Sequence, residues 1–363
     1  MKMKSIIRTA ALLAAAAVAT PAFAGGVTIA KDGDSKLKLE AKVFAAATSY
    51  KKETTTAGTT VVNNKSRSVS LDRAYLGIKY YFDDDWMMRI TYDVNNETGL
   101  GKSQQVFLKY AYLEGKLAGK AAVLRLGQSH TPWIDYEQGL WKHRYVSKVT
   151  SDEYKYDSSS ELGIGLKGKV DMFHYFVTAT DGNSYSKAKN FKSNTGSTVI
   201  DLNARVGVTP VEGLTIDAQY ITGYNGSKFL NSTVAVKQTF TQFMVTYGMG
   251  HDFRVGANYM TDKGTPDANS TKVKVKTNAF GLWGWANFTD NMGAFARYEQ
   301  KTDKIAVTNA QKSKRYVAGF EYTPRKHVNL SLAIDSLKVS NLGSVANKSE
   351  KVTRVGLYSQ FKF

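Results

Sequence analysis

The sequence predicts an all-β fold, a transmembrane antiparallel up-and-down β-barrel of sixteen strands. Three observations predict it. Apolar and polar residues alternate with a period of two over segments of about ten residues, which is the period of a strand. These segments end alternately in a tight turn and in a longer polar connection, and aromatic residues gather at the segment ends. Short turns on one side and longer loops on the other are typical of a membrane barrel.

The alternation is clearest in the first two segments. Between Ser35 and Ala47, apolar side chains take the odd positions, and Lys36, Lys38, Glu40 and Lys42 take the even ones. The run Arg73–Phe82 repeats the pattern with opposite parity. By the same count, further strands are expected near 86–94, 105–117, 122–129, 160–169, 171–180, 198–208, 214–224, 235–247, 253–262, 272–287, 292–302, 314–323, 328–339 and 350–363.

The connections alternate in length along the chain. The expected short turns are 83–85, 118–120, 168–171, 209–213, 248–252, 289–291 and 323–327. The expected longer loops are 51–65, 95–104, 130–159, 181–197, 225–234, 261–271, 302–312 and 340–351. The third of these, His130–Ser159, is the longest, and a long loop in a compact fold is usually functional or disordered.

Aromatic side chains bracket the short turns, as Tyr80, Tyr81, Phe82 and Trp86 do around 83–85. Such rings concentrate at membrane–water interfaces, although β-propensity alone also favours them in strands. The last segment alternates through Val355, Leu357 and Phe361 to Phe363. It resembles the final strand of bacterial outer-membrane proteins, which ends in Phe as an assembly signal.

The first 24 residues resemble a secretory signal peptide. Lys2, Lys4 and Arg8 precede an alanine-rich apolar run that is too short to span a bilayer, and an A-x-A site ends at Ala24. An amphipathic surface helix is the alternative. We expect cleavage after Ala24, which leaves residues 25–363 as one barrel domain.

The composition excludes several classes of function. The chain has no cysteine, so it has neither disulfides nor thiolate metal sites. Its formal net charge is +18, or +15 without the first 24 residues. So basic a chain usually suggests a nucleic-acid partner, but export argues against one. Anionic solutes in a pore, lipopolysaccharide phosphates and acidic surfaces remain as partners.

The run from Leu124 to Trp133, LRLGQSHTPW, resembles a segment of the phosphate-selective porins of the O and P type. Arg73–Gly77 and Ala111–Gly115 also resemble the A-Y-L-G strands of Gram-negative porins. This resemblance implies a homotrimer of sixteen-stranded barrels in the outer membrane, each with its third long loop folded into the lumen. It also implies passive diffusion of small hydrophilic solutes and ions.

Several arginines share the polar face of their strands. An arginine facing the bilayer midplane would cost roughly 2–4 kcal/mol, so any membrane barrel keeps them inward. The alternative is a cationic wall that attracts phosphate-like oxyanions, because guanidinium binds them with two parallel hydrogen bonds. The candidate pore-lining residues are Arg73, Arg89, Arg125, Arg205, Arg254, Arg297, Arg315 and Arg354.

The loop His130–Ser159 is the candidate constriction. Its six Trp and Tyr residues indicate that it packs against other parts of the chain. Its mixed charges would set up a field across the pore and weaken strict anion selectivity. The candidate constriction residues are Asp135, Glu137, Lys142, His143, Arg144 and Lys148.

We expect no enzymatic activity, cofactor or metal. The five histidines show no H-x-x-x-H or H-E-x-x-H spacing, and neither a G-x-S-x-G elbow nor a phosphate-binding loop occurs. A channel with anion preference is the main hypothesis. A structural or receptor-type barrel with a closed lumen is the alternative, and a barrel enzyme with dispersed site residues stands behind both.

Overall fold

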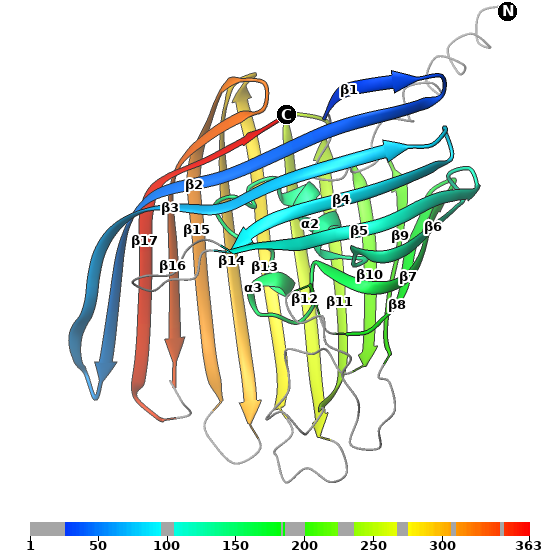
Figure 1. The fold of residues 1–363 in the computed structure, drawn as a ribbon. Coiled ribbons are helices and arrows are strands. Elements are labelled where there is room, and N and C mark those ends of the chain that lie inside the picture. Colours follow the sequence, from blue (N-terminus) through cyan, green and yellow to red (C-terminus); the bar gives the residue numbers. More distant parts are fainter. Residues whose placement is uncertain are drawn as a thin grey trace, which may run out of the picture.

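The computed structural model describes residues 26–95, 105–182, 184–185, 200–223, 236–266, 275–305, 310–341 and 345–363. Sixteen strands form one closed antiparallel barrel, seen from the side in Figure 1. They are β2 Ser35–Thr56, β3 Thr59–Tyr81, β4 Trp86–Asn95, β5 Gln105–Ala118, β6 Ala122–His130, β7 Ser160–Val170, β8 Phe173–Thr180, β9 Asp201–Val211, β10 Leu214–Gly223, β11 Val236–Met249, β12 Phe253–Pro266, β13 Val275–Thr289, β14 Met292–Ile305, β15 Gln311–Arg325, β16 Val328–Ser340 and β17 Lys348–Lys362.

The barrel closes between its last and first strands. β17 pairs antiparallel with β2 from Lys348 opposite Thr56 to Lys362 opposite Lys42. Every other strand pairs with its neighbours in sequence, so the ring has up-and-down topology. The predicted fold class and the count of sixteen barrel strands are confirmed.

An additional short strand was not predicted. β1, Val27–Asp32, pairs antiparallel with the first residues of β2, from Val27 opposite Leu39 to Asp32 opposite Ser35. It precedes the ring and is not one of the sixteen barrel strands. The expected signal peptide, residues 1–24, lies outside the described residues.

The predicted loop 51–65 is wrong, because most of it is strand. β2 runs to Thr56, β3 begins at Thr59, and Ala57 and Gly58 make the turn with φ of 48° and 87°. Two successive positive φ values are typical of the tight hairpin turns that match strand twist. The threonines and valines on both sides favour extended backbone, and this tendency outweighs the loop-like polarity of the segment.

The two faces of the strands differ in the sense expected for a barrel in lipid. On β10, Ile216 and Tyr220 are 42% and 48% exposed, whereas the alternate residues Asp217 and Gln219 are 1% exposed. The apolar parity therefore faces outward and the polar parity faces inward, the reverse of a soluble sheet. Within the described ranges, no helix is long and apolar enough to cross a membrane.

Candidate functional site

The connection between β6 and β7, residues 131–159, is the candidate site, and we call it the β6–β7 segment. It contains the helices α2, Ile134–Trp141, and α3, Thr150–Glu153. In Figure 1, α3 is drawn below β4 and β5 and α2 above it. The boundaries of this segment agree with the predicted loop 130–159.

Apolar packing holds α2 against the far strands of the barrel. Trp133 and Trp141 are 0% and 1% exposed. The ring of Trp141 meets those of Trp283 and Phe295 edge-on, at centroid distances of 5.9 and 5.8 Å. In addition, Trp285 Nε1 donates a hydrogen bond of 2.9 Å to the carbonyl of Leu140. Trp141, one of the aromatic residues that mark this loop in the sequence, is therefore a packing contact with β13 and β14.

Polar contacts join the same segment to strands around the ring. Each pairs one residue of the segment with an inward-facing residue of a strand, and together they reach from β10 to β16. The contacts are Tyr136 Oη to Asp217 at 2.8 Å, Asn258 Nδ2 to Glu137 Oε1 at 2.9 Å, Thr150 Oγ1 to Glu299 at 2.5 Å, Arg315 to Glu153 at 2.8 Å, and Tyr145 Oη to Ser331 at 2.6 Å.

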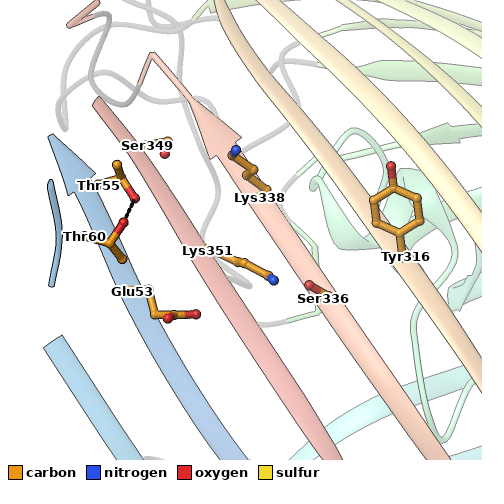
Figure 2. A pocket seen from close by; sticks show the side chains of 8 residues that line it. All are labelled: Glu53, Thr55, Thr60, Tyr316, Ser336, Lys338, Ser349 and Lys351. Atoms are coloured by element: carbon orange, nitrogen blue, oxygen red, sulfur yellow. Dashed lines mark hydrogen bonds between the residues drawn. The ribbon is translucent and has the colours of Figure 1, made fainter. Parts of the chain in front are cut away.

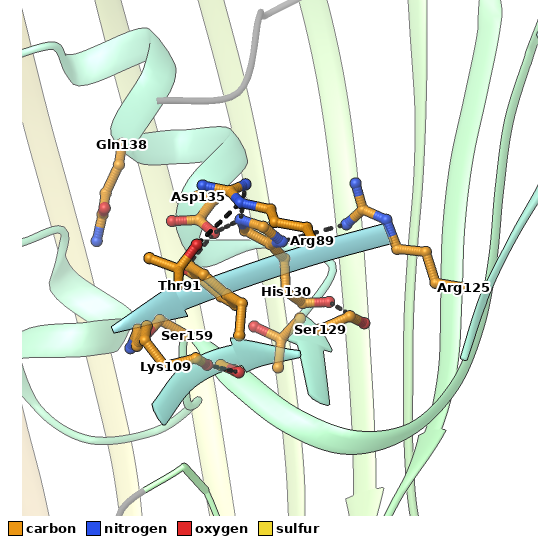
Figure 3. Close-up of polar contacts among 12 residues, drawn as sticks. Arg89, Thr91, Lys109, Arg125, Ser129, His130, Asp135, Gln138 and Ser159 are labelled. Carbon is orange, nitrogen blue, oxygen red and sulfur yellow. Dashed lines mark hydrogen bonds and ion pairs between the residues drawn. The ribbon is translucent and has the colours of Figure 1, made fainter. Parts of the chain in front are cut away.

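A cluster of charged and aromatic residues joins the start of the segment to β4–β6 (Figure 3). His130 stacks on Tyr110 at a centroid distance of 3.9 Å, and its Nε2 lies 3.1 Å from Asp135 Oδ2. Arg89 and Arg125 approach its two ring nitrogens at 3.5 and 3.4 Å. Asp135, a segment carboxylate, thus contacts the ring of His130, which two arginines of the strands also approach.

The other candidate constriction residues have varied partners. Lys142 places its ammonium 3.6 Å from the ring centroid of Trp285, and His143 Nε2 lies 3.5 Å from Glu321. Arg144 and Lys148 both lie 3.7 Å from carboxylate oxygens of Asp152 within the segment itself. The segment therefore presents both signs of charge.

The structure pairs most of the eight candidate arginines with carboxylates. The parity of all eight places them on the inward face, but their exposures differ: Arg354 is exposed, Arg73 and Arg254 are half-buried, and the other five are buried. The pairs are Arg73–Asp93 at 2.8 Å, Arg89–Glu40 at 3.5 Å, Arg125–Glu114 at 2.7 Å, Arg205–Asp217 at 2.9 Å, Arg315–Asp335 at 2.6 Å, and Arg297–Glu299. Arg254 instead donates to Thr246 Oγ1 at 3.1 Å, and Arg354 lies 5.7 Å from the ring of Tyr50.

Buried charges of the strands divide the described part of the ring into two arcs. From β2 to β6 they are five cations, Lys42, Lys79, Arg89, Lys109 and Arg125, and two carboxylates, Glu40 and Asp93. From β7 to β16 they are three cations, Arg205, Arg297 and Arg315, and six carboxylates, Glu161, Asp201, Asp217, Asp262, Glu299 and Asp335. Among these fully buried charges, cations therefore outnumber carboxylates on β2–β6 and carboxylates outnumber cations on β7–β16.

Sequence reasoning missed the lysines and carboxylates of this arrangement, although the parity that selects arginines also selects Lys42, Lys109 and Asp262. It could not group them into arcs, because the residues come from strands far apart in the chain. Among the residues that the structure describes, no group of three or more His, Asp or Glu residues could hold a metal ion.

Burial raises the pKa of Glu137, on α2, to about 7. The carboxyl ordinarily titrates near 4.5, so the docked segment holds its proton more tightly than a detached, hydrated segment would. The contribution of Glu137 to docking therefore falls as the pH rises from about 4.5 to about 7, by on the order of 3 kcal/mol in total.

We expect the Glu137→Gln variant to lose this part of the pH dependence. Trp133 and Trp141 report docking, because their emission shifts to the red when water reaches them. The wild type should show a larger red shift between pH 5 and pH 8 than the variant. Glu53→Gln, at a half-buried carboxylate of the β2–β3 hairpin that pairs with Lys51, is the control and should behave as the wild type. Identical pH profiles for the wild type and Glu137→Gln would contradict the assignment.

Comparison with known proteins supports the fold. No protein-family model matches the sequence, and no curated protein matches it. The anion-selective porin from Comamonas acidovorans is 13% identical, with a TM-score of 0.66 over 91% of this chain and 100% of that one. The outer membrane channel DcaP of Acinetobacter baumannii is 14% identical, with a TM-score of 0.63 over 93% and 100%. OmpF of Salmonella typhi, solved with daunomycin, is 13% identical, with a TM-score of 0.59 over 93% and 100%.

Proposed function

We propose that the protein is an outer-membrane channel for passive diffusion of small hydrophilic solutes and ions. The observation that carries this proposal is the closed ring of sixteen strands with its polar parity facing inward. A barrel of this size is wide enough to hold an aqueous channel rather than only packed side chains. The fold is shared with integral outer-membrane barrels that are porins and channels.

The β6–β7 segment is the proposed constriction, folded into the lumen. Its contacts with inward-facing residues from β5 to β16 support this placement. A cavity of about 280 Å³ lies beside it, lined among others by Lys42, Lys142, Lys362 and Glu321. Ions that pass the segment would therefore meet fixed charges of both signs.

The proposed ion preference is for anions, and it is weak. The β2–β6 arc and the net charge of the chain favour anions, whereas the carboxylates of the remaining strands oppose them. The five buried arginines already contact carboxylates, so their guanidinium groups are not available for bidentate hydrogen bonds to phosphate. We therefore propose attraction of oxyanions by charge, with phosphate among the solutes.

Reversal potentials in a KCl gradient across a planar bilayer test the ion preference. The wild type should give a potential of the anion-selective sign. Lys42→Gln should shift the chloride-to-potassium permeability ratio toward potassium by roughly twofold, since one charge beside a low-dielectric wall changes the local ion concentration by at least that much. Glu321→Gln, in the same cavity, should shift the ratio the opposite way. Lys120→Gln, at an exposed turn, is the control. A cation-selective wild type would overturn the anion preference.

One observation favours the alternative, a structural or receptor-type barrel with a closed lumen. Trp133, Ile134 and Trp141 are almost inaccessible, so the segment packs tightly against the strands that it contacts. Conductance separates the two functions: regular single-channel steps support the channel, whereas folded protein that produces none supports the closed barrel.

Export and assembly complete the proposal. We propose that residues 1–24 are a cleaved signal peptide and that the barrel forms a homotrimer in contact with outer-membrane lipid and lipopolysaccharide. N-terminal sequencing of the protein extracted from membranes tests the cleavage after Ala24. The mass of the detergent-purified complex tests the trimer.

A further inference from the structure

Six lysines on the outward face of the barrel form what we call the lysine belt. They are Lys263 on β12, Lys276 on β13, Lys304 on β14, Lys314 on β15, Lys338 on β16 and Lys351 on β17. All six are exposed. Each shares the parity of apolar side chains that face lipid on its own strand, as Lys276 does with Phe280 and Lys338 with Leu332.

Strand pairing places these lysines in two rows of three. Lys276 is the direct partner of both Lys263 and Lys304 across β12–β14. Lys338 is likewise the direct partner of Lys314 and Lys351 across β15–β17. Neighbouring strands lie about 4.8 Å apart, and like charges directly opposite one another destabilise a sheet. Such rows are expected only where anions complement them.

The protein itself supplies little compensating charge. In the described part of the chain, none of the six ammonium groups lies within 4 Å of a carboxylate. Glu53 is the register partner of Lys351, but its carboxylate pairs with Lys51 at 2.7 Å. The belt therefore presents a net positive surface to its surroundings.

The belt lies at the end of the barrel that carries the longer connections. Lys304 is one residue from the end of β14, and Lys338 is two residues from the end of β16. In outer-membrane barrels this end faces the exterior, and the short turns face the periplasm. The side chains thus sit at the height of the outer-leaflet headgroups, just beyond the apolar band.

The strands β5, β7, β9 and β10 lack such lysines, whereas Lys51 and Lys65 form one further direct pair on β2 and β3, next to β17. At the same end of β5, β7, β9 and β10, the outward positions among the described residues are apolar or aromatic: Val106, Leu162, Leu202 and Tyr220. A general need for charge at the membrane surface would act on all strands. The one-sided belt instead indicates a binding surface on β12–β17.

A hollow next to the second row offers room for a headgroup (Figure 2). It has a volume of about 430 Å³ and is lined by Lys338 and Lys351, by the carboxylate of Glu53, which pairs with Lys51, and by hydroxyl-bearing residues such as Tyr316, Ser336 and Ser349. Ammonium and hydroxyl groups are the donors that a phosphate accepts from.

We propose that the lysine belt binds the phosphate groups of phosphorylated glycolipid headgroups in the outer leaflet. Each lysine near an anionic headgroup adds to the attraction, and the two rows match a headgroup that carries more than one phosphate. The proposal concerns the outer surface of the barrel and does not depend on what passes through its lumen.

The test is a binding measurement by native mass spectrometry. The purified protein, in zwitterionic detergent, is offered diphosphorylated lipid A. The wild type should bind it at least about tenfold more tightly than the dephosphorylated lipid, and the Lys314→Gln, Lys338→Gln, Lys351→Gln variant should lose that difference. The control replaces three exposed lysines at the short-turn end, Lys120, Lys169 and Lys326, and should bind as the wild type does.

Several outcomes would overturn the proposal. They are equal binding of the two lipids by the wild type, unchanged binding by the belt variant, and complete displacement of the lipid by millimolar inorganic phosphate, which would make free phosphate the ligand. Binding of the lipid by the wild type should also weaken as the salt concentration rises, and this measurement requires no variant. Planar-bilayer recording shows separately whether the belt variant still forms the channel.

Discussion

Replacing residues 131–159 by an Asn-Gly turn is expected to raise single-channel conductance by at least about twofold, because the proposed constriction is removed and sixteen strands leave a wide lumen. The design is feasible because His130 and Ser160 are direct register partners, so a two-residue turn can join β6 to β7. The measurement is step conductance in a planar bilayer at fixed KCl concentration.

Shortening the β2–β3 hairpin is the matched control for this deletion. Its tip, Thr54–Thr60, contains a tight turn, and among the described residues it forms no hydrogen bond or ion pair with the β6–β7 segment. Its loss should leave the conductance unchanged. If the conductance of the 131–159 deletion equals that of the wild type, the segment is not the constriction. If the wild type gives no steps and the deletion does, the segment closes the lumen.

Substituting Trp141 by alanine is expected to release the β6–β7 segment without opening the barrel. Trp141 is 1% exposed and packs against Trp283 and Phe295. Loss of a buried tryptophan costs roughly 3–5 kcal/mol, and this loss falls on the contact that packs α2 against β13 and β14. Conductance should rise toward that of the deletion, and tryptophan emission should shift to the red.

The control for Trp141→Ala is Phe320→Ala, because Phe320 faces outward and is 67% exposed. It removes an aromatic ring from the same barrel without touching the segment, so both the conductance and the emission should stay as in the wild type. Noisy conductance with rapid steps is also expected of Trp141→Ala, because a detached segment moves within the lumen. Wild-type conductance in this variant would show that Trp141 does not hold the constriction.

The local pattern of the sequence predicts the barrel. Membrane strands repeat a period of two, and alternate turns differ in length, so the number of strands and their inward faces follow from counting. The pattern wrongly predicts a loop at 51–65, because threonine is polar. Its β-branched side chain nevertheless favours extended backbone, and the β2–β3 hairpin continues through this segment. Parity also places Arg89 and Arg315 on the inner face without revealing their carboxylate partners.

Charge compensation and docking are decided by the tertiary structure. Arg315 forms ion pairs with Asp335 of the neighbouring strand and with Glu153, which lies more than 150 residues earlier in the chain. No local sequence pattern predicts these pairs. The two lysine rows likewise exist only because the register sets Lys276 opposite Lys304 and Lys338 opposite Lys351. The alternation of apolar and polar residues involves residues that are neighbours in the chain, so it can be read from the sequence. Strand register and the docking of the β6–β7 segment depend on which strands lie side by side after the ring closes.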